Sequence, residues 1–151
     1  MLDNTEKQLL QQIAGISGFQ PGSAFNLRAN GSGVERHSTP QVTIRQKSDK
    51  PGIDIFVAPH TEGEQVHIPV IITESGVNDL VYNDFYIGEG AQVEIIAGCG
   101  IHNDGCDTSQ HDGIHTFHIG KQAHVVYTEK HYGEGNGEGG RILNPTTNIY
   151  M

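Results

Sequence analysis

The side chains best suited to chemistry are concentrated between residues 97 and 118. Two thiols and four imidazoles fall within twenty residues there, at Cys99, Cys106, His102, His111, His115 and His118. Thiolates and imidazoles together suit zinc, iron or iron–sulfur chemistry. The spacing of Cys99, His102, Cys106 and His111 matches no recognised zinc-finger arrangement, so a compact structural zinc site stays one hypothesis among several.

Cys99 differs from the other candidates. It continues the alternation of Val93, Ile95 and Ala97, so a straight strand would aim its sulfur toward the interior. Glycines on both sides would let the backbone bend and a substrate approach, and His102 would lower the thiol pKa. A free cysteine is also often a small buried hydrophobe. The residues alone support both interpretations.

Other motifs argue against particular functions. His115 and His118 lie in a strand-like run where alternation sends them to opposite faces, so we expect one of them on the surface. The glycine-rich segment 133–140 lacks a following helix, and its two glutamates would repel phosphate. We therefore interpret it as a surface loop. No nucleophile elbow or Ser-His-Asp order supports hydrolysis.

Composition narrows the class of protein. The chain has 151 residues, 20 of them glycine, and a formal net charge of −9 with nine Lys and Arg. Acidity of this size makes nucleic-acid binding unfavourable. The sequence contains no apolar stretch of membrane-spanning length and no secretory signal pattern, so we expect a cytoplasmic protein with reduced cysteines and no membrane contact.

The elements that must position these residues are mostly strands. We expect a helix over 4–14, begun by a capping box of Thr5 and Gln8 and ended at Gly15, that caps the β core or docks a partner. Residues 18–40 read as irregular. Beyond them, alternation predicts strands punctuated by glycine turns. Faint repeats link 62–68 with 89–95 and 87–93 with 119–125. Repeated turn–strand units must stack, as a β-helix or a cupin-like double-stranded barrel.

In order and spacing, residues 66–147 resemble the SufB/SufD family of the SUF iron–sulfur assembly machinery. Val66-His67-Ile68-Pro69-Val70 is similar to the segment that enters the family's β-helix. The other matches are a glycine turn at 87–93, Ala97-Gly98-Cys99 in place of a Glu-Gly-Cys motif, a strand start at 110–115, and an aromatic, glycine-rich loop at 132–141.

This resemblance implies a right-handed parallel β-helix and a non-enzymatic scaffold. Its partners would be a SufC-type ABC ATPase, a cysteine-desulfurase sulfur donor and a second scaffold subunit in a homo- or heterodimer. Cys99 matches the position that accepts sulfur. His102, Cys106, His111 and His115 are then candidate ligands for a metal or cluster, with an iron–sulfur cluster formed in the complete complex.

The chain departs from the family pattern in two respects. Ala97 replaces a glutamate, and His102 and Cys106 add ligands that the family does not share. We expect an N-terminal helix with an irregular cap over 1–40 and a β-helix over 41–151 that is truncated at its C-terminus and self-associates through the open edge. The alternatives are a cupin-like Fe or Zn protein using His102, His111 and His115, and a zinc-stabilised β domain.

Overall fold

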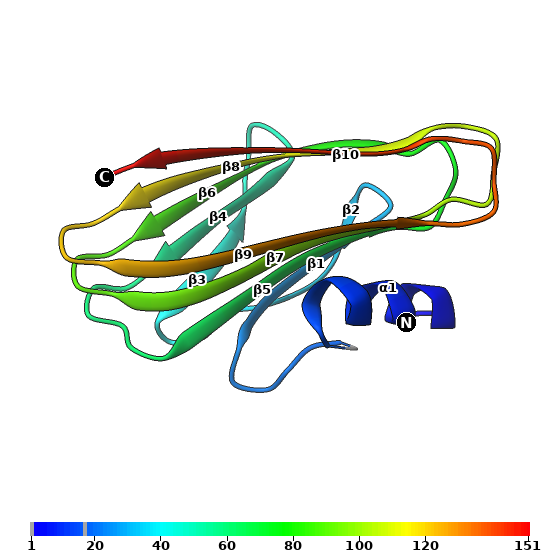
Figure 1. Ribbon diagram of the computed structural model, residues 1–151. Coiled ribbons are helices and arrows are strands. Elements are labelled where there is room, and N and C mark those ends of the chain that lie inside the picture. The colour runs from blue at the N-terminus through cyan, green and yellow to red at the C-terminus, as the bar shows by residue number, and fades with distance from the viewer. Residues whose placement is uncertain (1, 17) are drawn as a thin grey trace.

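Two five-stranded sheets face each other along the molecule (Figure 1). The structure is a computed structural model, and it describes residues 2–16 and 18–151. The first sheet has the order β2-β1-β5-β7-β9 and the second the order β10-β8-β6-β4-β3. The elements are α1 (Asn4–Ala14), β1 (Ala24–Ala29), β2 (Ser32–His37), β3 (Val42–Gln46), β4 (Gly52–Val57), β5 (Glu64–Ile72), β6 (Asn78–Ile87), β7 (Gln92–His102), β8 (Ser109–Ile119), β9 (His124–Glu134) and β10 (Arg141–Tyr150).

From β4 onward the chain alternates between the two sheets, and each strand pairs in parallel with the strand two elements later. The result is a β-solenoid of about three turns. Residues stacked on successive coils are 32 apart in its later part, as Asn83 and His115 are. The predicted all-β solenoid with a short N-terminal helix is therefore confirmed. The cupin-like alternative is wrong, because jelly-roll barrels are built from antiparallel strands.

Alternation along the strands builds the core between the sheets. Ile55 and Ile95 are fully buried there, and the stacked rings of Phe85 and Phe117 lie 4.4 Å apart between their centroids. Stacking follows from the register, since Phe85 and Phe117 are direct partners on β6 and β8. One apolar set thus repeats from coil to coil.

The segment predicted as irregular contains two strands, which corrects the expected cap over 1–40. Strand β1 pairs with β5 in parallel and with β2 in antiparallel fashion, so it belongs to the first sheet. Its residues Ala24, Phe25, Asn26 and Leu27 are all buried. A strand that is buried on both faces shows no alternation of apolar and polar residues. The sequence of β1 therefore lacked the two-residue pattern by which a strand is recognised. Residues 1 and 17 of this predicted segment lie outside the described residues.

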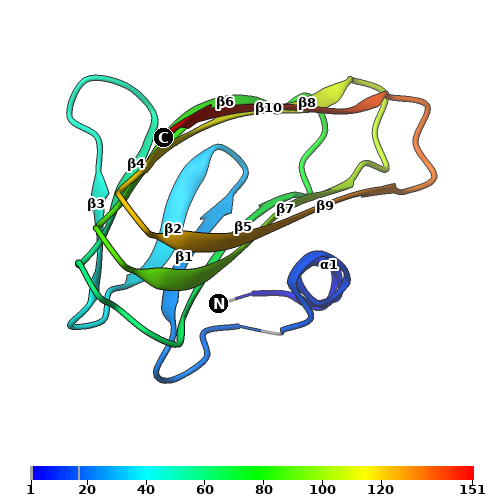
Figure 2. The same cartoon turned by 60° about the vertical axis from the view of Figure 1, so that its left-hand side comes forward.

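Helix α1 has the predicted range but a different N-terminal cap. Asp3, not Thr5, accepts from the Glu6 backbone, and the Glu6 side chain accepts in turn from the Asp3 backbone. Gly15 ends the helix in a left-handed conformation, as expected. The helix packs against β5, β7 and β9 and so covers the outer side of the first sheet instead of an end of the solenoid (Figure 2).

The glycine-rich loop of residues 135–140 stacks on the turn of the preceding coil. A Cβ at Gly135, Gly137 or Gly139 would collide with backbone of residues 103–107. Arg141 fastens the stack by donating to the carbonyls of Asn103, Glu134, Gly135 and Gly137. The glycines are therefore required by close backbone approach at the surface, a role unrelated to phosphate.

Among residues 2–16 and 18–151, no helix is both long and apolar enough to cross a bilayer.

Candidate functional site

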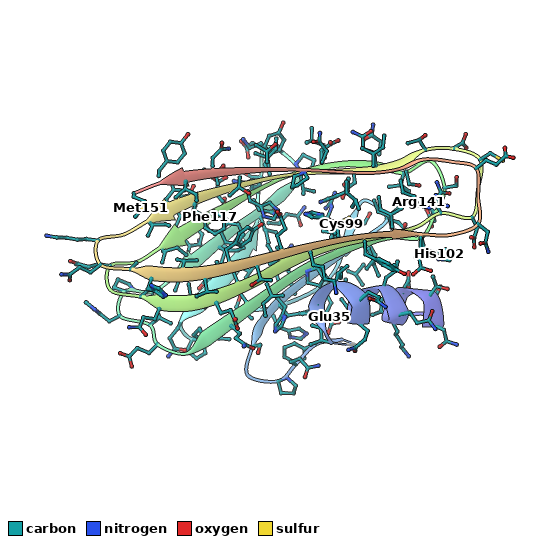
Figure 3. All side chains as sticks on the ribbon, viewed as in Figure 1. Glu35, Cys99, His102, Phe117, Arg141 and Met151 are labelled. Carbon is teal, nitrogen blue, oxygen red and sulfur yellow. The ribbon has the colours of Figure 1, made fainter. Side chains whose placement is uncertain are left out.

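Cys99 lies on the inner face of β7, between the two sheets (Figure 3). Its residue is 1% exposed, and in the register it stands between Val70 of the preceding coil and His131 of the next. The predicted inward orientation of the thiol is confirmed. Arg28 of β1 is in turn the register partner of Val70. Arg28, Val70, Cys99 and His131 therefore occupy the same inward position on successive strands of the first sheet.

The glycines on either side of Cys99 allow helix α1 to pack closely against β7. Alternation turns Gly98 and Gly100 toward α1, where a Cβ on Gly98 would lie 3.1 Å from the Ile13 Cβ and 2.8 Å from the Lys130 carbonyl oxygen. A Cβ on Gly100 would lie 3.2 Å from a Leu9 methyl carbon. The sequence suggested that these glycines admit a substrate, but they let a helix pack closely on the opposite face.

A small cavity of about 10 Å³ adjoins the Cys99 thiol. A space of this size is about the minimum for one water molecule, so the interior is closely packed. Three imidazoles and one carboxylate are among the groups that line it. Its lining comprises Ile68, Val70, Gly98, Cys99, His111, Gly113, His115, Glu129, His131 and Pro145.

His111 belongs to a buried ion-pair network. Its Nδ1 lies 3.3 Å from Asp79 Oδ2, and Arg28 donates to both oxygens of Asp79. Burial alone would raise the pKa of Asp79, but hydrogen bonds from His111 and Arg28 outweigh burial and lower that pKa to about 2. A carboxylate is therefore held ionised inside the solenoid by its two partners.

His115 is the centre of a hydrogen-bonded chain. Its Nδ1 lies 2.6 Å from the Tyr127 hydroxyl, which donates to Glu129 Oε1 at 2.8 Å. Since the hydroxyl hydrogen goes to Glu129, Nδ1 must carry the imidazole hydrogen, and Nε2 is left to accept from the Asn83 amide at 3.4 Å. Burial lowers the pKa of His115 to about 4, so this imidazole is neutral at pH 7.

The next pair in this chain of hydrogen bonds is Tyr127 and Glu129. Burial, followed by the hydrogen bond to Glu129, raises the pKa of Tyr127. His131 extends the line, with its Nε2 3.4 Å from Glu129 Oε2. The side chains of Glu129 and His131 are 21% and 27% exposed, so the polar chain leads from the buried imidazole toward solvent.

The resting thiol of Cys99 is neutral, which corrects the expectation of a pKa lowered by His102. Burial, followed by the charge of Asp79, raises the Cys99 pKa. His102 lies at the end of β7, and its ring nitrogens face Asp104 and Glu134 at 2.7 and 2.8 Å (Figure 3). Those carboxylates raise the pKa of His102, chiefly through the hydrogen bond that its ring donates to Asp104.

The structure divides the predicted ligands between two places. His111 and His115 line the cavity with Cys99, whereas His102 lies at the outer bend and Cys106 is exposed in the following turn. Within the described residues, no three His, Cys, Asp or Glu side chains are placed to hold a metal ion. His118 lies on the outer face between Tyr86 and Tyr150, opposite to His115 as alternation predicted.

Sequence reasoning missed Tyr127, Glu129 and His131. The signal was present, because the recurrence of Ile87-Gly88 as Ile119-Gly120 already sets a period of 32 residues. Adding one period to Ala97 and Cys99 gives Glu129 and His131, their partners in the structure.

Comparison of the chain with family models, curated protein sequences and solved structures finds no match. The likeness to SufB and SufD therefore rests on the motifs described above.

Proposed function

We propose that this protein is a scaffold component of iron–sulfur cluster assembly that accepts sulfur on Cys99. The observation that carries the proposal is the position of the thiol, which faces the lumen of a parallel solenoid in a cavity also lined by three imidazoles and one carboxylate. A thiol inside such a lumen can hold sulfane sulfur away from solvent. The motif around Cys99, which resembles the family's sulfur-accepting position, supports the same conclusion.

The proposed reaction is a sulfur transfer without net oxidation. Cys99 Sγ attacks the terminal sulfur of a persulfide on the donor, a sulfur–sulfur bond forms on Cys99, and the bond within the donor breaks. The proton lost by Cys99 goes to the departing donor thiolate. Because burial keeps Cys99 protonated, a base must take the proton first, and the imidazole of His131, its register partner, is the nearest candidate by strand pairing.

The lumen fits a sulfur atom better than a cluster. Iron–sulfur clusters are bound by several thiolates, whereas Cys99 is the only cysteine that lines this cavity, and the cavity measures about 10 Å³. A cluster would therefore require ligands from outside this region. Because this cavity does not suit a cluster, we propose that His111 and His115 position the sulfur atom there. His102 and Cys106 remain candidate ligands on the outer bend.

The partners proposed are those that the resemblance implies. A cysteine-desulfurase system would donate sulfur, a SufC-type ATPase would drive rearrangement, and a second scaffold subunit would supply further ligands. All of these belong to the cytoplasm.

The test is radiolabelled sulfur transfer from labelled cysteine through a desulfurase, with the proposed SufC-type ATPase and ATP present because the resting thiol is buried. The wild-type chain should gain close to one sulfane sulfur per molecule, Cys106→Ser should match it, and Cys99→Ser should gain almost none. Circular dichroism checks that both variants fold. Equal loading of Cys99→Ser and the wild type would refute the sulfur role.

A further inference from the structure

A second, larger cavity lies at the N-terminal end of the lumen. It measures about 670 Å³ and is bounded by the β1–β2 hairpin, the turn between β3 and β4, Ile68 and Val70 of β5, and Val81 and Asn83 of β6. The two hairpins are the blue and cyan segments of Figure 2. Cavities of roughly 300–1,000 Å³ are typical of small-molecule sites in proteins.

Basic residues gather at this cavity although the chain is acidic. Arg28, Arg36, Lys47 and Lys50 line it, which is four of the nine Lys and Arg in a chain of net charge −9. Asp49 is the only carboxylate among the described lining residues. Carboxylates outside the lining neutralise Arg28 and Lys47, so the positive charge left to attract an anion is chiefly that of Arg36.

The two arginines are the cations best placed to face a ligand. Lys47 bonds to Asp54 and Asp84, and Lys50 lies over the Tyr82 ring, so both ammonium groups are engaged elsewhere. Arg28 is oriented by its two-pronged contact with Asp79. Arg36 donates through Nε to the Asn26 amide oxygen at 2.8 Å, and its two terminal nitrogens make no hydrogen bond or ion pair to the described residues.

We propose that this cavity binds the phosphate or sulfate group of a small anionic ligand. Arg36 would donate to it through its free nitrogens, and the hydroxyls of Ser32 and Ser48 and the Arg28 guanidinium would add donors from other directions. Guanidinium and hydroxyl donors contributed by several segments suit a tetrahedral oxyanion, which accepts hydrogen bonds on all sides. This proposal does not depend on the sulfur role of Cys99.

Calorimetric titration with inorganic phosphate tests the site, and glycerol 3-phosphate serves as the second probe. We expect saturable binding of one phosphate per chain, weakened at least about tenfold by Arg36→Gln, because a charge-assisted contact is lost. Arg45→Gln is the matched control: it makes the same change of charge on β3, but Arg45 lies over the Phe56 ring and outside the cavity lining. The affinity of the Arg45→Gln variant for phosphate should stay within about twofold of the wild-type affinity.

The outcomes are distinct. Tighter binding of glycerol 3-phosphate than of phosphate would support a site built for a phosphate monoester. Failure of both probes to saturate the wild-type chain would overturn the proposal. Equal weakening by Arg36→Gln and Arg45→Gln would also overturn it, since that result means general charge attraction. Unchanged melting curves for the two variants ensure that a loss of binding is not a loss of fold.

Discussion

Cys99 and His131 are register partners on consecutive coils, so a thiol and an imidazole occupy the same inward position at the spacing of neighbouring parallel strands, about 4.8 Å. Val70 covers the thiol from the preceding coil. Cys99 thus has an apolar side chain as its register partner on one side and an imidazole on the other. Access to the thiol should therefore depend on the last coil.

The two cysteines should differ sharply in reactivity. At pH 8 we expect a disulfide reagent such as DTNB to modify Cys106 rapidly and Cys99 only on unfolding, because Cys99 is buried with a raised pKa and Cys106 is exposed. The amount of coloured thiolate that the reagent releases from native protein counts the accessible cysteine, and the amount released from denatured protein counts both cysteines. The Cys106→Ser variant should release almost none while folded, and rapid modification of that variant would contradict a buried Cys99.

Replacement of Gly98 by alanine should destabilise the chain. The added methyl group would press on the Ile13 side chain and the Lys130 carbonyl, so we expect a loss of about 1–3 kcal/mol in the free energy of unfolding, measured by urea denaturation. Gly133→Ala is the control on β9, because its Cβ would stand in ordinary contact 3.4 Å from the Arg141 Cβ. Similar losses for both variants would mean that helix α1 does not pack on Gly98.

Stability should fall as the pH drops from about 6.5 toward 4. His115 has its pKa lowered to about 4 in the folded chain, so the unfolded chain binds its proton more readily in this window, and protons favour unfolding. The shift corresponds to at most roughly 3 kcal/mol. His115→Gln should be less stable at pH 7 but lose less stability than the wild type on acidification. Parallel pH profiles would show that His115 titrates normally.

Asn103 should be important for the stacked turns. It is fully buried, donates to the carbonyls of Asp107 and Gly140, and accepts from the Gly105 backbone. Asn103→Ala removes these three hydrogen bonds and leaves the Gly105 N–H without its acceptor, so it should lower the free energy of unfolding by about 2 kcal/mol. Asn136→Ala, an exposed change in the adjacent loop, should be nearly neutral by the same thermal or urea measurement. A neutral Asn103→Ala would refute this role.

The sequence predicts the solenoid because its interior repeats. Alternation from Val42 onward identified β3, β4, β5, β7, β8 and β9 but not β6, and the parity of Val93, Ile95 and Ala97 correctly oriented Cys99. Strand β1 escaped prediction because burial of both faces removes the alternating pattern. The N-cap of α1 was placed at Thr5 instead of Asp3 because the sequence offers two capping boxes. Thr5 is followed three residues later by Gln8, and Asp3 by Glu6.

The chemistry of the site was harder to predict than its location. Proximity in sequence favoured His102 as the partner of Cys99, but in a solenoid the neighbours of a residue lie one coil away, at Val70 and His131. The pKa of the thiol depends on burial, which spacing along one strand does not reveal. The function of Gly98 and Gly100 was likewise hidden, because the helix that they contact lies some ninety residues earlier in the chain.

Peptide mapping by mass spectrometry tests the central proposal most directly. After sulfur transfer from a desulfurase and alkylation of the folded and then the unfolded chain, the peptide containing Cys99 should carry one additional sulfur atom, protected from alkylation until unfolding. Sulfur found on Cys106 alone, or on neither cysteine with a donor that loads an established scaffold in parallel, would contradict the account.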